Sequence, residues 1–158
     1  MNLKVCKFGG TSMADKTAIL RVKDILASDP SRRFVVVSAP GKRFKEDVKI
    51  TDQLYACFDE KQKEGTCVKA FAPIRTRFAE IVKELNVDLD IDKYLDEAEK
   101  GINASTRPDY AASRGEYLSA LIMSRVMGYE FVDAAEIIKF NENGVFDLQH
   151  TCDLITKR

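Results

Sequence analysis

The sequence predicts an α/β domain organised around a mainly parallel sheet, and three observations support this prediction. Residues 3–8 alternate like a strand, residues 19–26 carry apolar side chains at helical spacing, and residues 34–37 form a continuous apolar run. A strand, a helix and a strand in this order favour two parallel strands joined by a crossover. Moreover, 158 residues with 45% hydrophobic side chains suffice for one domain with a sizeable core.

The first strand, residues 3–8, contains β-branched and aromatic residues and stops at two consecutive glycines, which indicate a tight turn. We expect Thr11 or Ser12 to be the N-cap of the following helix, because a hydroxyl oxygen accepts hydrogen bonds from first-turn amides. Asp15 stands three residues after Ser12, where a capping box places an acidic side chain. The helix should end before Pro30, because proline cannot continue it.

The second strand, residues 34–37, is expected to be buried on both faces, because continuous apolar runs are typical of strands in parallel sheets. Residues 51–103 have a helical pattern throughout, with several separate apolar stripes. The lysine and glutamate residues of this segment are expected to lie on solvated faces. The middle of the chain should therefore build structure and leave the chemistry to the flanking segments.

The last third of the sequence also begins with a helix. Residues 108–127 form an amphipathic pattern that Gly128 closes at a C-cap position. We expect a short strand at residues 130–132, then a turn-rich segment, and a final helix from residue 148 to residue 155.

Composition excludes several classes of function. Lysine plus arginine and aspartate plus glutamate are 25 each, so no whole-molecule field draws the chain to nucleic acid or to an anionic membrane. The apolar runs are far shorter than the roughly 20 residues that a membrane span requires. The first residues enter a strand-like run without a signal-peptide pattern. We therefore expect a cytoplasmic protein without a nucleic-acid or membrane partner.

Cysteine and histidine do not suggest a metal site. The four cysteines are scattered without a CxxC pair, and His150 has no second ligand at metal-site spacing. We expect four reduced thiols and no metal site in the protein. A redox or zinc role would need partners that only the fold brings together.

Residues 7–12, Lys-Phe-Gly-Gly-Thr-Ser, are the first candidate site. Two glycines between a strand and a helix let the backbone approach a ligand, and their N–H groups with the helix N-terminus favour an anion such as phosphate. Lys7 could reach a transferred phosphoryl group and offset its charge. The pattern is neither a Walker A loop nor the dinucleotide GxGxxG pattern. The alternative is a turn in which the glycines have only a backbone role.

Ser38 and Thr51 are candidates for binding a substrate. Ser38 follows the second strand, and ligands of open parallel sheets bind at the carboxyl ends of strands. Alternatively, the hydroxyl of Ser38 satisfies its own turn. Thr51 begins a helical segment, where either it or Asp52 could instead be the N-cap.

Residues 113–120 contain the third candidate site. Ser113, Glu116 and Ser119 are three residues apart and share a helix face, while Gly115 is expected to leave room for a ligand beside the carboxylate. Glu116 could bind an ammonium group through a charge-assisted hydrogen bond. The alternative is an ordinary solvated glutamate on a helix.

These segments together resemble the aspartate kinase family. Residues 7–15, Lys-Phe-Gly-Gly-Thr-Ser-Met-Ala-Asp, are similar to its N-terminal signature, and residues 113–119 match its Ser-x-Gly-Glu-x-x-Ser pattern. The resemblance implies a three-layer α/β/α sandwich around a mainly parallel sheet, of the amino-acid-kinase or carbamate-kinase-like type. It also implies transfer of the γ-phosphoryl group of ATP, with Mg2+, to the β-carboxylate of L-aspartate. This reaction is the first step toward lysine, threonine and methionine.

The resemblance also implies a role for each candidate residue. Lys7 would stabilise the phosphoryl group in transfer, and phosphoryl transfer depends mainly on positioning and charge stabilisation. The phosphate-binding turn would consist of Gly9, Gly10, Thr11 and Ser12. The amino acid would be contacted by Ser38, Thr51 and Glu116. Glu116 would bind the α-amino group. Residues 42–49 make the segment before Thr51 longer than the compact form common in the family.

The resemblance places residues 1–158 in the N-terminal, amino-acid-binding part of the catalytic domain. No counterpart of the nucleotide-binding half or of the regulatory domains is found in the sequence, so we expect this chain to be inactive alone and to form a homo-oligomer or to self-associate. One alternative is a kinase for another amino acid, such as glutamate or N-acetylglutamate. Another is a non-catalytic domain that binds an amino acid or is completed by a partner subunit.

Overall fold

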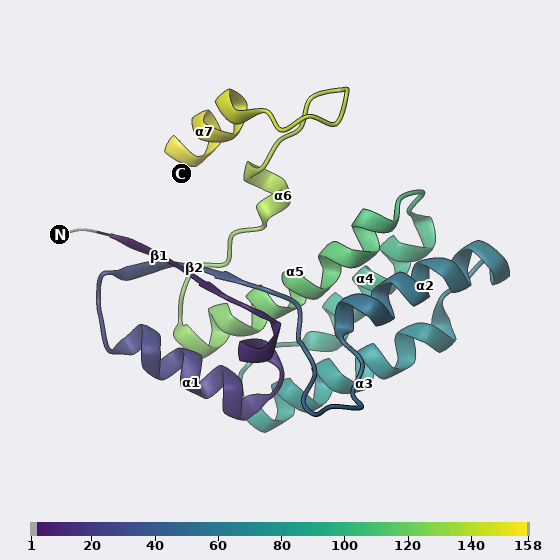
Figure 1. The fold of residues 1–158 in the computed structure, drawn as a ribbon, viewed down its shortest axis with the longest axis horizontal. Coiled ribbons are helices and arrows are strands. Elements are labelled where there is room, and N and C mark those ends of the chain that lie inside the picture. The colour runs from purple at the N-terminus through teal and green to yellow at the C-terminus, as the bar shows by residue number, and fades with distance from the viewer. Residues whose placement is uncertain (1–2, 158) are drawn as a thin grey trace.

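The computed structural model describes residues 3–157. Figure 1 shows a small sheet beside a group of helices, with a separate segment that leads to the C-terminus. In chain order the elements are β1 (Lys4–Phe8), the 3-10 helix η1 (Gly10–Met13), α1 (Lys16–Ala27), β2 (Arg32–Val37), α2 (Ile50–Glu64), α3 (Val68–Leu85), α4 (Ile91–Ala104), α5 (Pro108–Met127), α6 (Ala134–Ile137) and α7 (Leu148–Thr156).

The two strands are parallel, as the strand–helix–strand pattern predicts. Their register pairs Lys7 with Val36 and Phe8 with Val37. Both strands therefore end at the same edge of the sheet, and the turns that follow them lie next to each other. Helix α5 packs on β2 and also contacts α1.

The prediction that residues 34–37 are buried on both faces is wrong. Val37 is only 7% exposed, whereas Phe34 is 55% and Val36 50% exposed. Successive residues of a strand point to opposite faces, so one face packs on helices and the other does not. Within the described residues, the helices that pack on the sheet cover only the face of Val37.

The first helix begins later than predicted. Residues Gly10–Met13 form the 3-10 turn η1, and α1 starts at Lys16 with Asp15 as its N-cap. A carboxylate oxygen of Asp15 accepts a hydrogen bond from the backbone N–H of Ala18 at 2.9 Å. The expected N-cap at Thr11 or Ser12 is therefore wrong, because the extra turn separates the two glycines from α1.

The helical middle of the chain is confirmed and forms the three helices α2, α3 and α4, and the predicted helix at residues 108–127 is α5. Residues Gly65, Asn86 and Gly128 end α2, α3 and α5 in the left-handed conformation, with φ of 80°, 52° and 66°. The largest fully buried side chains of these helices form the core: Ile50, Leu54, Phe71, Ile74, Phe78, Leu95, Ile102, Leu118 and Ile122.

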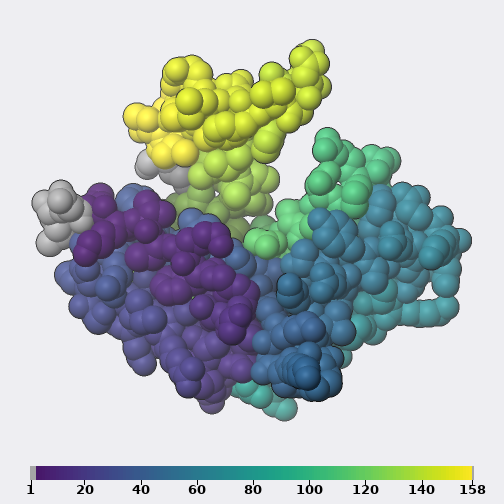
Figure 2. Space-filling model, in the orientation of Figure 1, coloured from purple at the N-terminus to yellow at the C-terminus, as the bar shows by residue number. Residues whose placement is uncertain are grey.

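The predicted strand at residues 130–132 is wrong, because these residues connect α5 to α6 without belonging to a strand. The predicted final helix is confirmed as α7. Figure 2 shows the segment that contains α6, in light green, and α7, in yellow, standing off the rest of the molecule. Its backbone closes on itself, because the N–H of Asp147 donates to the carbonyl of Lys139 at 2.8 Å. No helix within residues 3–157 is long and apolar enough to cross a membrane.

Candidate active site

Two glycine-containing turns meet where the parallel strands end. The N–H of Gly41, in the turn after β2, donates to the carbonyl oxygen of Gly10 at 2.8 Å. A Cβ atom placed on Gly41 would lie 2.7 Å from the carbonyl carbon of Gly10 and 2.9 Å from the nitrogen of Thr11. These distances are below any normal contact, so the two turns approach each other closely because Gly41 has no side chain.

Gly9 has a different environment. Its φ of −79° is available to any residue, and a Cβ placed on it would meet no described atom within 4 Å. The backbone of Gly9 is therefore open to the outside. Neither packing nor backbone strain therefore requires a glycine at this position.

The carboxylate of Glu116 reaches the end of β2. Its Oε1 accepts a hydrogen bond at 3.2 Å from the backbone N–H of Ala39, the residue after Ser38, although 77 positions of sequence separate the two partners. The backbone N–H of Ser38 in turn donates to the carbonyl of Phe8 at 3.0 Å. The structure therefore brings Ser38, Glu116 and the double-glycine turn together at one edge of the sheet.

Lys7 and Ser38 lie on the same face of the sheet. Lys7 pairs with Val36 in the register of the strands, and Ser38 is two residues beyond Val36. Because side chains alternate along a strand, both point away from the face that carries Val37 and packs on the helices. Lys7 is exposed, so its ammonium group can reach a ligand that binds at this edge.

Thr51 lies in the first turn of α2 and is half-buried. The N–H of Ile50 donates to the carbonyl of Pro40 at 3.1 Å, which fixes the start of α2 beside the turn after β2. The expected N-cap at Thr51 or Asp52 is wrong, because Lys49 is the N-cap and makes no side-chain capping bond. The hydroxyl of Thr51 is therefore not needed as a helix cap.

The prediction that Gly115 leaves room for a ligand is wrong, because the space beside it is filled by protein. A Cβ on Gly115 would lie 2.5 Å from the Cβ of Ala39 and 3.2 Å from Cδ1 of Leu54. The missing side chain allows α5 to approach the end of β2 and thereby places Glu116. Ser119 is 1% exposed, and among residues 3–157 its hydroxyl has no hydrogen-bond partner.

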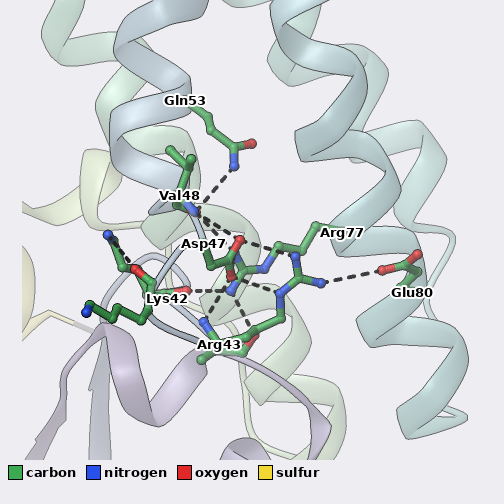
Figure 3. A network of polar contacts seen from close by, with 10 residues as sticks. Lys42, Arg43, Asp47, Val48, Gln53, Arg77 and Glu80 are labelled. Atoms are coloured by element: carbon green, nitrogen blue, oxygen red, sulfur yellow. Dashed lines mark hydrogen bonds and ion pairs between the residues drawn. The ribbon is translucent and has the colours of Figure 1, made fainter.

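Sequence reasoning missed a buried ionic pair beside this edge. Arg77 of α3 and Asp47 of the loop before α2 are both buried, with 3.1 Å between Nη1 and Oδ2. Figure 3 shows Asp47 between the side chains of Arg43 and Arg77. One signal was available: Arg77 occupies a position of the apolar stripe that contains Ile74 and Phe78, where a charged side chain must be buried.

The carboxyl group of Asp47 is expected to make the stability of the fold depend on pH. Hydrogen bonds from the Arg43 guanidinium lower the pKa of Asp47 well below its usual range. A lowered pKa stabilises the fold above the unfolded carboxyl pKa of about 3.9, and this contribution is lost as the pH falls toward the folded value. The difference in unfolding free energy between wild type and Asp47→Asn should be constant above about pH 5 and should shrink below about pH 4.

Urea unfolding at a series of pH values measures this difference. The matched control is Asp88→Asn, because Asp88 is exposed on the connection between α3 and α4. The control should match wild type at every pH. A difference for Asp47→Asn that is unchanged down to about pH 2 would contradict the assignment.

The cysteines offer no reactive thiol in the core. All four are free, and burial raises the pKa of Cys57 to about 12 and that of Cys67 to about 11. A thiol with so high a pKa is almost entirely protonated near neutral pH and is a poor nucleophile or ligand. No group of three or more His, Cys, Asp or Glu side chains within the described part of the chain could hold a metal ion.

One edge of the α/β fold thus brings together the ends of two parallel strands, a double-glycine turn and a carboxylate from a distant helix. The chain belongs to the amino acid kinase family, whose model matches residues 2–151. Aspartokinase 3 of Bacillus subtilis (strain 168) is 34% identical to this chain over 151 residues. That alignment covers 91% of this chain and 33% of the Bacillus protein.

Solved structures agree on the fold. The crystal structure of Clostridium acetobutylicum aspartate kinase superimposes with a TM-score of 0.92 at 43% identity, over 98% of this chain and 35% of that one. Escherichia coli aspartokinase III in complex with aspartate and ADP matches with a TM-score of 0.76 at 23% identity, over 99% of this chain and 37% of that one. The predicted fold class and resemblance are confirmed, and the chain spans about a third of the length of these relatives.

Proposed function

We propose that this chain provides the amino-acid-binding part of an aspartate kinase catalytic domain, which phosphorylates the β-carboxylate of L-aspartate. The observation that carries the proposal is the hydrogen bond from the N–H of Ala39 to Glu116, because it brings a carboxylate to the strand end beside the double-glycine turn. The 34% identity with Bacillus subtilis aspartokinase 3 supports the choice of substrate. The nucleotide-binding half would belong to sequence that these residues do not contain.

In this proposal each predicted residue has one task. Glu116 binds the α-ammonium group of aspartate, while Ser38 and Thr51 contact the rest of the amino acid. The phosphate groups are bound by Lys7 and by the backbone and side chains of Gly9, Gly10, Thr11 and Ser12. An oxygen of the β-carboxylate attacks the γ-phosphorus of ATP, the bond to the bridging oxygen breaks, and ADP leaves. Lys7 offsets the charge of the phosphoryl group in transfer.

The geometry of the turn fits a nucleotide phosphate. Gly9 is open to the outside and Lys7 is exposed beside it, so an anion can approach both. Mg2+ prefers phosphate oxygens and waters over a cage of protein ligands, and it would therefore bind together with ATP.

Calorimetry with L-aspartate tests the proposal. We expect wild type to bind and Glu116→Gln to bind roughly 10-fold to 100-fold more weakly, because a hydrogen bond to a charged group contributes about 1.5–3 kcal/mol. The exposed Glu84 on α3 provides the control Glu84→Gln, which should bind like wild type. Equal affinity of wild type and Glu116→Gln, or tighter binding of glutamate than of aspartate, would contradict the proposal.

Measurement of turnover tests whether the nucleotide-binding half lies outside these residues. Aspartyl phosphate, trapped as the hydroxamate, should form slowly or not at all when this chain is incubated with Mg-ATP and L-aspartate. Full turnover by these residues alone would contradict the placement of the nucleotide-binding half outside them.

The proposal includes self-association of the chain. Val5, Phe34 and Val36 are 70%, 55% and 50% exposed and lie on one face of the sheet. A contiguous apolar strip of this kind favours association. Light scattering should therefore report species heavier than the 17.8 kDa monomer, and a monomer at all concentrations would contradict it.

A further inference from the structure

The guanidinium group of Arg77 joins two loops that are distant in sequence. Its Nη2 donates to the carbonyl of Ala14, at the end of η1, at 3.0 Å, and also to the carbonyl of Gly41 in the turn after β2. Its Nη1 donates to the carbonyl of Val48 at 3.3 Å. One buried side chain of α3 thus holds backbone on both sides of the candidate active site.

Asp47 compensates the charge of Arg77 and orders the second loop. One of its oxygens lies 3.1 Å from Nη1 of Arg77 and accepts hydrogen bonds of 2.9 Å from both the backbone N–H and Nε of Arg43. The other accepts from the N–H of Val48 at 3.0 Å. Figure 3 shows this arrangement in the loop between β2 and α2.

The contacts of Arg77 lie next to the point where the two turns meet. Gly41, whose carbonyl accepts from Arg77, donates its N–H to the carbonyl of Gly10. Ala14, the other acceptor, directly follows η1, which begins at Gly10. The guanidinium is therefore bonded to the backbone on either side of the contact between the two turns.

We propose that Arg77, held by Asp47, is a positioning residue that fixes the two turns of the active site relative to each other. The expected effect of Arg77 on ligand binding rests on the proposed function. Its expected effect on the two turns rests on the hydrogen bonds alone. Arg77 itself is only 3% exposed, so it is not accessible to a ligand from solvent. It acts through the carbonyls of Ala14 and Gly41, and thereby supports the single hydrogen bond between Gly41 and Gly10.

The geometry requires an arginine and not merely a positive charge. A guanidinium presents five donors in a planar fork, so it can bond to the carbonyls of Ala14 and Gly41 and to Asp47 at the same time. A lysine at this position would keep the charge near Asp47 but has one compact ammonium group. Arg77→Lys therefore separates loss of the fork from loss of the buried charge.

The experiment measures amide hydrogen exchange by NMR and calorimetric affinity for L-aspartate in the same variants. The control is Arg75→Lys, because Arg75 lies on the same helix and forms ion pairs with Asp96 and Glu99 on the protein surface. In Arg77→Lys we expect the Gly41 amide to exchange at least 10-fold faster than in wild type, after correction for the exchange of the core amide of Phe78. Aspartate should bind at least 5-fold more weakly.

Several outcomes decide the inference. Faster exchange at Gly41 with unchanged exchange in Arg75→Lys supports it. Equal acceleration at Gly41 and Phe78 would show that Arg77 only stabilises the whole fold, and would overturn it. If wild type does not bind aspartate, the proposed function fails, while the exchange of Gly41 still tests the positioning role by itself. Unchanged exchange at Gly41 overturns the inference whatever the affinity.

Discussion

Replacing Lys7 with methionine is expected to weaken binding of Mg-ADP roughly 10-fold to 100-fold, because a charge-assisted contact with a phosphate contributes about 1.5–3 kcal/mol. Lys7 is exposed at the end of β1, on the face that also carries Ser38. Its loss removes no buried contact, so the unfolding free energy should stay within about 0.5 kcal/mol of wild type. In this variant the affinity for Mg-ADP is therefore expected to fall while the unfolding free energy stays close to that of wild type.

Calorimetry with Mg-ADP and urea unfolding measure the two quantities. Lys4→Met is the matched control, because Lys4 lies in the same strand but forms an ion pair with Asp29 at 2.6 Å, near the other end of the sheet. The control should keep wild-type affinity. Equal affinities of Lys7→Met and wild type for Mg-ADP would show that Lys7 does not bind the phosphates.

Replacing Gly41 with alanine should cost about 1–3 kcal/mol of unfolding free energy or more, because the new methyl group overlaps backbone atoms. The Cβ would lie 2.7 Å from the carbonyl carbon of Gly10 and 2.9 Å from its oxygen, and backbone cannot rotate away as a side chain can. The two turns must separate. Binding of both aspartate and Mg-ADP should therefore be lost together with stability.

Gly9→Ala is the informative partner of this substitution. At φ −79° and without a described neighbour within 4 Å, the added methyl group should leave stability unchanged or raise it by up to about 1 kcal/mol. If phosphates approach the backbone of Gly9, the same methyl group should nevertheless weaken binding of Mg-ADP. A stable Gly9→Ala variant with full affinity would show that the ligand approaches elsewhere, and a stable Gly41→Ala variant would contradict the contact between the turns.

Local sequence patterns were sufficient for most of the elements and for the edge of the sheet where the candidate site lies. The alternation of residues 3–8 and the apolar run at 34–37 predicted two parallel strands, and such strands necessarily end at the same edge. The glycine at position 128 marked the end of α5 correctly. Each of these predictions depends on neighbouring residues only, which a single sequence displays.

Features that depend on distant contacts were not predictable in this way. Gly115 is small because Ala39 packs against it, and the burial of Arg77 depends on carbonyls from two other loops. The N-cap was misplaced for a related reason: both Ser12 and Asp15 can cap a helix, and only the tertiary position of η1 decides between them. The roles of the site residues stay predictions.

In the proposed site, the turn after β1, the turn after β2, the start of α2 and the middle of α5 bind one ligand together. A titration of the backbone amide NMR signals with L-aspartate, up to about 10 mM, tests this arrangement most directly. We expect the perturbed signals to be those of residues 7–12, residues 38–41, Thr51 and Glu116. Perturbations confined to the region of α4 or α7, or none at all, would contradict it.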